Sequence, residues 1–214
     1  IPWQDIPTLN LHGETANVVR IAAMNRRCFF LLGGKITVQD ICKRLCKYGM
    51  GDIHVYIGEM LGYPQERILK GTAQDFIEIE INKLSVMMTE NSYPETHIRS
   101  GIPDEEFIRG KVPMTKSEIR SLVISKLGIA PSDIVWDIGC GTGSVSVEMA
   151  LQCYKGTVYS IDLNPEAIEL TKQNALKFRC DNIDISLGSA PEITEHFLTP
   201  DKIFIGGLVG GLKN

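Results

Sequence analysis

A glycine-rich turn that follows an apolar run constrains the fold of this chain more than any other feature. Residues 136–148 read WDIGCGTGSVSVE, and glycine occupies every second position at Gly139, Gly141 and Gly143. The apolar residues before the glycines predict a buried strand, and the pattern after them predicts a helix. Glycine allows both a sharp turn and a close approach of other groups to the backbone. The stretch therefore predicts a strand-turn-helix unit in which something lies against the turn.

Strands and helices alternate through the rest of the second half of the chain. The expected order is strand 133–139, helix 144–153, strand 156–162, helix 165–178, strand 182–188, helix 190–198 and strand 202–207. This alternation is typical of a parallel sheet covered by helices. The expected fold class is α/β with a Rossmann-like C-terminal domain, which is incomplete because only these four strands can be counted.

A further helix is expected before the first of these strands. Thr115 and Glu118 have the T-x-x-E spacing of a capping box, and Gly128 ends the helix. Apolar residues recur at helical spacing and should form its buried face, namely Ile119, Leu122, Val123 and Leu127. In the same way, Asn164 followed by Pro165 predicts a later helix start.

The first half of the chain is expected to fold as a separate α/β unit. Residues 26–34 predict a buried strand, and Thr37 opens a helix with Asp40 in its first turn. Another strand is expected within 52–62. The alternation of apolar and charged residues within 75–89 predicts a half-buried strand around Phe76 to Ile81.

A polar segment separates the two halves. Residues 90–101 read ENSYPETHIRSG, contain a proline and a glycine, and show no periodic pattern. The expected organisation is a first domain at 1–89, a linker at 90–100 and a second domain at 101–214.

Composition excludes several classes of protein. The 214 residues are 43% hydrophobic and 22% charged, as is ordinary for a soluble globular protein. The net charge is −4 and no basic run forms a stripe, so nucleic acid is not an expected partner. No apolar run reaches membrane-spanning length and no secretory leader opens the sequence, so no membrane partner and a cytoplasmic location are expected.

The six cysteines are scattered through apolar or helical segments without a C-x-x-C pair. In a chain of this length they are expected to be reduced, buried thiols. Cys42 and Cys46 lie one helical turn apart and could be two metal ligands, but core packing is favoured. The histidines have no metal-ligand spacing, and no metal site is expected.

The residues around the glycines distinguish between three interpretations of the turn. Asp137 precedes them, and Asp162 ends the next strand about twenty residues on, where an acidic side chain reaches a ribose hydroxyl. The dinucleotide pattern is G-x-G-x-x-G, whereas the pattern here is D-x-G-x-G-x-G. An acid at the first position repels a pyrophosphate and suits a cationic amine. The pattern favours S-adenosylmethionine over NAD, and a tight turn without a ligand stays open.

Four blocks in the second half together resemble a known family. They are GIPDEEFIRGKVPMTKSEIR at 101–120, WDIGCGTGSVSVE at 136–148, GSAPE at 188–192 and FIGG at 204–207. They are similar to the cobalamin-pathway enzymes that methylate C15 of a precorrin and remove the carboxyl of its C12 acetate. Residues 2–14 and 58–76 are similar to the C-terminal half of a C5-methylating tetrapyrrole methylase. The chain thus resembles, over nearly its whole length, the fused precorrin-6Y C5,15-methyltransferases (decarboxylating).

This resemblance implies an S-adenosylmethionine-dependent C-methyltransferase that acts on a tetrapyrrole. It implies that the glycine turn lines the methionine part of the cofactor, that Asp162 holds the ribose and that Ala190 lies by the adenine. The cofactor-binding residues expected in this way are Thr115, Asp137, Gly139, Cys140, Gly141, Thr142, Gly143, Asp162 and Ala190. The family also suggests a homo-oligomer, either a dimer or a tetramer.

A precorrin carries many carboxylates, so cationic side chains are expected to hold it. The candidates are Arg109, Lys111, Lys116 and Arg120. Asp104, Glu105 and Lys116 are the expected catalytic residues, with the two acids handling a proton during decarboxylation. Acids at a helix start are equally explained by the helix dipole.

Two other functions stay open at this stage. The same sheet could serve a nicotinamide-dependent oxidoreductase, and the chain could be a non-catalytic binding fragment. The second alternative arises because the first half of a tetrapyrrole methylase is missing from the sequence. In addition, Glu14 follows His12 and Gly13 where the family pattern has an arginine, so C5 methylation by residues 1–89 alone is not expected.

Overall fold

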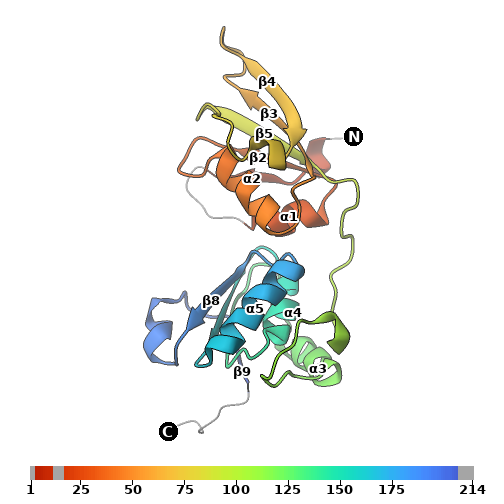
Figure 1. The fold of residues 1–214 in the computed structure, drawn as a ribbon, viewed down its shortest axis with the longest axis vertical. Coiled ribbons are helices and arrows are strands. Elements are labelled where there is room, and N and C mark those ends of the chain that lie inside the picture. The colour runs from red at the N-terminus through yellow and green to blue at the C-terminus, as the bar shows by residue number, and fades with distance from the viewer. Residues whose placement is uncertain (1–2, 12–16, 207–214) are drawn as a thin grey trace. The chain divides into compact units, whose positions relative to one another are not determined.

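The computed structural model describes residues 3–11 and 17–206 (Figure 1). The chain divides into two compact units, Ile1–His97 and Ile98–Asn214, and each is described by itself. The block with His12 and Glu14, and all residues from 207 onward, lie outside the described ranges. Within those ranges, no helix combines the length and the apolar character needed to cross a bilayer.

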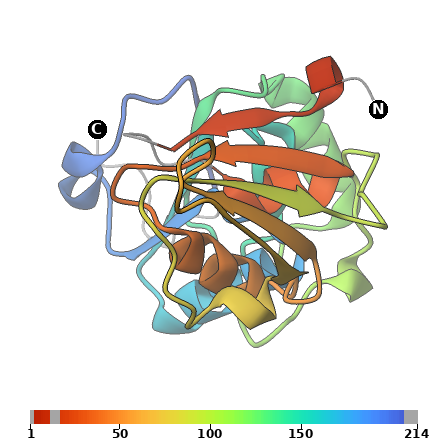
Figure 2. The same ribbon diagram turned by 90° about the horizontal axis from the view of Figure 1, so that it is seen from above.

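The N-terminal unit is a five-stranded sheet with helices on one face (Figure 1). Across the sheet the strands are β1 (Thr8–Asn10), β2 (Arg27–Leu31), β5 (Ser85–Glu90), β3 (His54–Glu59) and β4 (Arg67–Thr72). β1 is parallel to β2, and the other neighbours are antiparallel. The 3-10 helix η1 (Trp3–Asp5) precedes β1, and the two α-helices are α1 (Val18–Met24) and α2 (Val38–Lys47). Figure 2 looks onto this sheet.

Alternation along the strands builds the core of this unit. Cys28 and Phe30 of β2 and Met87 of β5 are buried, whereas the residues between them are half-buried. Successive side chains of a strand point to opposite faces, so one face of the sheet supplies the core. Ile41 and Leu45, one turn apart on α2, complete it.

The start of α2 confirms the helix predicted at Thr37. The Thr37 hydroxyl accepts a hydrogen bond from the Asp40 N–H at 3.1 Å, and the Asp40 carboxylate accepts one from the Thr37 N–H at 2.9 Å. This reciprocal arrangement is a capping box, which satisfies two backbone donors at the exposed helix end.

The strand predicted around Phe76 to Ile81 is wrong. Gln74–Phe76 form the short 3-10 helix η2, and the alternating strand of that region is β5, further along the chain. The Asp75 carboxylate accepts hydrogen bonds at 2.8 Å from both the backbone N–H and the hydroxyl of Thr72. These bonds close a turn directly after β4, a strand that the sequence pattern missed, so the chain cannot continue as an extended strand there.

The C-terminal unit confirms the predicted parallel sheet. Its order is β8 (Ile183–Leu187), β7 (Thr157–Asp162), β6 (Ile134–Ile138) and β9 (Lys202–Ile205), with every neighbouring pair parallel. The connecting helices are α3 (Ser117–Leu127), α4 (Ser144–Gln152) and α5 (Pro165–Lys177), as Figure 1 shows. In chain order the strands are arranged 3-2-1-4, as in a doubly wound fold, where the ligand crevice lies beyond the carboxyl ends of the strands.

Short 3-10 helices form two further segments of this unit. The helix predicted at 190–198 is reduced to η4 (Glu192–His196), and η3 (Asp104–Glu106) lies ahead of α3. The start of α5 agrees with the prediction, since the Asn164 side chain accepts a hydrogen bond from the Glu166 N–H at 2.9 Å.

The prediction for α3 is wrong in its cap and in half of its buried face, since Val123 and Leu127 pack against the core but Ile119 and Leu122 do not. Lys116, not Thr115, is the N-cap, and no side chain caps the helix start. Ile119 is 55% exposed, whereas Arg120 is 0% exposed and Ile124 is buried with it. Apolar spacing predicted a face that includes Val123 and Leu127 but is rotated away from Arg120. A buried ion pair of Arg120, described below, sets the rotation of α3 instead.

The cysteines lie where the sequence suggested. Five of the six are buried, namely Cys28, Cys42, Cys140, Cys153 and Cys180, and Cys46 is half-buried. Burial, and to a smaller extent the nearby Cys46 thiol, raises the pKa of the Cys42 thiol to about 12. Metal ligation requires thiolates, so core packing accounts for Cys42.

The two threonines at helix starts provide a matched test of these cap assignments. Thr37→Ala should destabilise the N-terminal unit by about 1 kcal/mol, because the Asp40 N–H loses its acceptor. Thr115→Ala removes no cap and should cost less than about half of that. Denaturant unfolding of each variant, followed separately for the two units, measures both costs. Equal costs would contradict the assignment.

Candidate functional site

The turn between β6 and α4 contains three glycines with left-handed backbone. The φ angles are +80° at Gly139, +57° at Gly141 and +74° at Gly143. The N–H groups of Gly139 and Cys140 both donate to the Ile161 carbonyl, at 2.9 and 3.0 Å. The turn is therefore tied to the end of β7, and each of its glycines adopts a conformation that other residues rarely adopt.

Two of these glycines are closely approached by the protein itself. A Cβ on Gly141 would lie 3.0 Å from the Pro113 carbonyl oxygen. A Cβ on Gly143 would lie 2.7 Å from the side chain of Thr171 on α5. Side chains are thus excluded from the turn by backbone conformation and by neighbouring segments. A side chain at Gly141 would distort the turn itself, so loss of ligand binding in such a variant would not show that the ligand lies against Gly141.

Asp162, at the end of β7, lies directly beside the turn. One carboxylate oxygen accepts a hydrogen bond from the Gly141 N–H at 2.9 Å, and the other accepts one from the Asn164 N–H at 2.9 Å. Its carbonyl accepts the Gly188 N–H at 3.0 Å. Asp162 therefore joins the glycine turn, the start of α5 and the loop after β8. Ala190 lies in that loop and is exposed.

Asp137 faces the interior of the unit. Its side chain is 0% exposed, and one carboxyl oxygen accepts a hydrogen bond from the Ser146 hydroxyl on α4. The other oxygen, Oδ1, has no hydrogen-bond partner among the described residues. Burial raises the pKa of Asp137 to about 7, and the charge of Asp162 adds to this effect. The acid of the D-x-G-x-G-x-G pattern is thus a buried group that exchanges its proton near neutral pH.

Cys140 and Thr142 also point into the protein. The Cys140 sulfur lies 3.4 Å from the Thr171 hydroxyl, and burial raises the pKa of this thiol well above its ordinary value. It is therefore not poised as a nucleophile. The Thr142 hydroxyl is buried and has no partner in the described part of the chain.

A segment that precedes α3 is held against the glycine turn by α5. The Asn174 amide donates to the carbonyls of Ile108 and Thr142, at 3.0 and 2.9 Å, and its oxygen accepts the Ile108 N–H at 2.8 Å. Glu166 accepts the Lys111 N–H at 2.9 Å. We did not single out Asn174 from the sequence. Its position within the apolar stripe of α5 was the available signal.

A buried ion pair fixes the other end of this segment. Arg120 and Glu148 are both 0% exposed, and the Arg120 Nε lies 2.7 Å from a Glu148 oxygen. Glu148 also accepts the N–H groups of Gly101 and Ile102, at 2.9 and 3.0 Å. The guanidinium donates to the carbonyls of Ile102 and Thr115. The interpretation of Arg120 as a substrate clamp is wrong, because its guanidinium is buried and is bound to Glu148 and to backbone carbonyls.

The expected catalytic residues lie next to this ion pair. Asp104 contacts Lys116 and Arg120, each at 3.2 Å. Burial raises the pKa of Asp104, but the hydrogen bonds from Lys116 and Arg120 outweigh burial and lower it overall. Asp104 is therefore a carboxylate at neutral pH. Glu105 is exposed, and so are the side chains of the candidate clamps Arg109 and Lys111.

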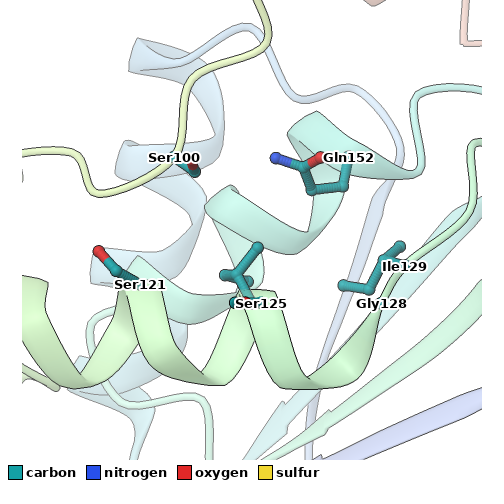
Figure 3. Close-up of a pocket in the computed structure, with 7 residues that line it drawn as sticks. Ser100, Ser121, Ser125, Gly128, Ile129 and Gln152 are labelled. Carbon is teal, nitrogen blue, oxygen red and sulfur yellow. The ribbon is translucent and has the colours of Figure 1, made fainter.

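A cavity of about 290 Å³ lies elsewhere in this unit (Figure 3). It is lined by residues of α3, of the segments before and after α3 and of the end of α4, namely Ser100, Ser121, Ile124, Ser125, Gly128, Ile129 and Gln152. Since α4 begins at the glycine turn and ends at Gln152, the cavity lies at the far end of that helix. It is separate from the glycine turn.

Metal ligation is not suggested by any side-chain cluster in residues 3–11 and 17–206. No group of three or more His, Cys, Asp or Glu residues is arranged there to hold a metal ion.

Breaking the buried ion pair should be costly. Glu148→Gln leaves the Arg120 guanidinium buried without a counter-charge, and we expect the C-terminal unit to lose about 3–5 kcal/mol of unfolding free energy. Glu106→Gln is the matched control, because the Arg99–Glu106 pair is exposed and should be worth less than about 1 kcal/mol. Urea unfolding measures both, and a small loss for Glu148→Gln would refute the role of the pair.

Asp137 should make stability depend on pH. Its pKa is raised in the folded state to about 7, so its contribution is fully present below the pKa of the unfolded chain and is lost as pH rises through 7. We expect the unfolding free energy of the C-terminal unit to decrease between about pH 5 and pH 8. Asp137→Asn should remove this part of the decrease. Parallel pH profiles for the two proteins would contradict the assignment.

Comparisons with known proteins match the C-terminal half of the chain to precorrin methyltransferases. The family model described as the precorrin methyltransferase domain matches residues 106–213, half of the chain. The chain is 48% identical over 116 residues to a probable cobalt-precorrin-6B C(15)-methyltransferase (decarboxylating) of Pyrobaculum calidifontis, covering 53% of this chain and 58% of the relative. It is 51% identical over 110 residues to the protein of the same description from Sulfurisphaera tokodaii, covering 50% and 57%.

A solved structure supports the fold. The crystal structure of a precorrin-6y C5,15-methyltransferase from Geobacter metallireducens GS-15 superposes with a TM-score of 0.50 at 35% identity, covering 52% of this chain and 58% of that chain. The fold of the C-terminal unit is Rossmann-like, as the sequence predicted. The chain spans just over half the length of the curated relatives it matches. By the extent of the family match, this chain belongs to the precorrin methyltransferase domain family.

Proposed function

We propose that the C-terminal unit binds S-adenosylmethionine at the glycine turn and takes part in the methylation of C15 of a precorrin, with decarboxylation of the C12 acetate, in cobalamin biosynthesis. The observation that carries the proposal is the 2.9 Å hydrogen bond between the Gly141 N–H and the Asp162 carboxylate. It unites the D-x-G-x-G-x-G turn and the strand-end acid at the carboxyl end of the sheet, in a chain of the precorrin methyltransferase domain family.

The charge around the turn fits this cofactor. The Asp162 carboxylate lies beside the turn, so the local field favours a cation and disfavours a pyrophosphate. S-adenosylmethionine carries a sulfonium and an ammonium group, and it supplies the methyl group when bound. Asp162 would hold the ribose, the backbone from Gly139 to Gly143 would line the methionine part, and Ala190 would lie by the adenine.

The segment before α3 would form the substrate side. Asn174 anchors one end of this segment, and Arg120 with Glu148 anchors the other. Thr115 and Lys116 follow closely after Pro113, whose carbonyl oxygen lies against Gly141. Asp104 stays ionised beside Lys116 and can accept but not donate a proton at neutral pH. Lys116, Arg109 and Lys111 would attract the carboxylates of the tetrapyrrole.

The N-terminal unit has a separate place in the proposal. Residues 1–89 would correspond to the C-terminal half of a tetrapyrrole methylase that serves C5, joined through 90–100 to the C15 domain. The block at 58–76 forms the end of β3, all of β4 and η2, and β3 pairs with β4 in the sheet of this unit. The full-length protein would act as a homo-oligomer in the cytoplasm.

Titration of the chain with S-adenosylmethionine and with NADH tests the cofactor assignment. We expect the first ligand to bind and the second to leave the calorimetric signal at the dilution heat. Asp162→Ala should weaken S-adenosylmethionine about tenfold, the effect of one charge-assisted hydrogen bond. Asp184→Ala, an exposed aspartate on β8, is the control and should bind normally. Tight NADH binding without S-adenosylmethionine binding would overturn the proposal.

The mass of the product tests the reaction. Incubation with a precorrin-6B-type substrate and S-adenosylmethionine should give a product that has gained one methyl group and lost one carbon dioxide. A product that gains a methyl group and keeps the carboxyl would limit the function to methyl transfer. Unchanged substrate in the presence of bound cofactor would remove the catalytic part of the proposal.

A further inference from the structure

We propose that Asp137 is a proton-exchanging group coupled to the ligand at the glycine turn, and that arrival of a cationic ligand expels its proton to the solvent. The inference rests on the proposed binding of S-adenosylmethionine and deepens it. It concerns how the site responds to pH, and it gives Ser146 the part of a positioning residue that acts through Asp137.

The carboxyl group is enclosed without being fully paired. It is 0% exposed, it accepts a hydrogen bond from the Ser146 hydroxyl, and its Oδ1 has no hydrogen-bond partner among the described residues. The backbone N–H of Ser146 also favours the ionised form, but less than burial disfavours it. A carboxylate in such a place would leave a buried charge uncompensated, which is costly. The neutral acid is therefore the form that the protein interior favours when no cation is near.

A second incomplete group lies next to it. Ser160 of β7 is the register partner of Asp137 on β6, and its side chain is also 0% exposed. Register partners on one face of a sheet have neighbouring side chains. The Ser160 hydroxyl has no hydrogen-bond partner in the described ranges. A hydroxyl can rotate, so that of Ser160 can donate a hydrogen bond across the strand pair when Asp137 is ionised.

The charges that surround Asp137 come from few sources. The Asp162 carboxylate at the end of β7 disfavours its ionisation, and the Cys140 thiol in the turn is itself neutral. On α4, Glu148 is paired with Arg120. From β9, the register partner is Phe204, which carries no charge. Lys202 of β9 lies two residues before Phe204, opposite Val135. No cation among the described residues contributes to the shift in the pKa of Asp137, so the ligand would bring the compensating charge.

The proposed step balances in protons and charge. In the free protein Asp137 carries a proton for much of the time at neutral pH. When S-adenosylmethionine binds over the turn, its positive charge favours the carboxylate, the O–H bond of Asp137 breaks, and the proton passes to the buffer. Binding and ionisation are linked. The ligand must therefore bind more tightly to the protein with ionised Asp137, by the same factor by which it increases the acid dissociation constant of Asp137.

Calorimetric titration with S-adenosylmethionine in two buffers of different ionisation enthalpy measures the protons released. With a pKa of about 7 in the free protein and a lower one in the complex, we expect release of up to about half a proton per ligand at pH 7, and almost none at about pH 9. Asp137→Asn cannot release this proton. The difference between the two proteins is the readout, since it removes protons exchanged by other groups and by the ligand. Equal release by both would overturn the proposal.

The serine variants provide a test that does not depend on Asp137→Asn folding. Ser146→Ala removes a hydrogen bond that favours the carboxylate, so the pH of maximum release should move upward. Ser146→Thr keeps a hydroxyl and should leave the profile close to that of the native chain. A merely structural role for Ser146 would change stability without moving the profile, and an unmoved profile in Ser146→Ala would refute its positioning role.

A second ligand identifies the source of the charge. S-adenosylhomocysteine has the same nucleoside and amino acid parts but lacks the sulfonium, and it should release fewer protons. Equal release by the two ligands would show that the sulfonium does not act on Asp137 and would overturn the coupling as stated. If S-adenosylmethionine gives no binding heat at any pH, the proposed function fails. Binding without proton release defeats this inference alone.

Discussion

The glycine turn after β6 is the constraint on which the C-terminal unit depends. Three residues with left-handed backbone reverse the chain over the end of β7, and only glycine adopts such angles readily. The reversal brings Gly141 against the Asp162 carboxylate and against the Pro113 carbonyl. It also starts α4 at Ser144, which places Ser146 over Asp137 and Glu148 beside Arg120. The site and its supports follow from one turn.

Buried polar side chains hold the segment before α3 beside the glycine turn. The segment from Gly101 to Thr115 has little regular structure, so its backbone groups need other partners. Glu148, Arg120 and Asn174 supply them from three different helices, with Gly101, Ile102, Ile108 and Thr115 as the groups served. An ion pair in the interior stabilises little by itself, but removing one partner is costly. This favours a single position for the segment beside the turn.

These arrangements explain why the acids near the turn differ in behaviour. Asp104 is held ionised by Lys116 and Arg120, whereas Asp137 is enclosed with a serine and takes up a proton near neutrality. The Asp162 carboxylate accepts hydrogen bonds from two backbone N–H groups. In the proposed enzyme, the three carboxyl groups would serve substrate, proton exchange and cofactor respectively. Environment, rather than residue type, separates their roles.

The sequence by itself determined the parallel sheet, its glycine turn, the strand-end acid and the family resemblance, because alternating strands and helices and glycine at every second position are local patterns. It also determined the capping box of α2, which involves residues three apart. It could not determine which face of α3 is buried, since Arg120 pairs with Glu148, distant in sequence. Nor could it show that Asn174 holds the segment before α3, or that Asp137 is enclosed. Each of these depends on a partner brought near only by the tertiary fold, where loss of water makes an unpaired polar group costly.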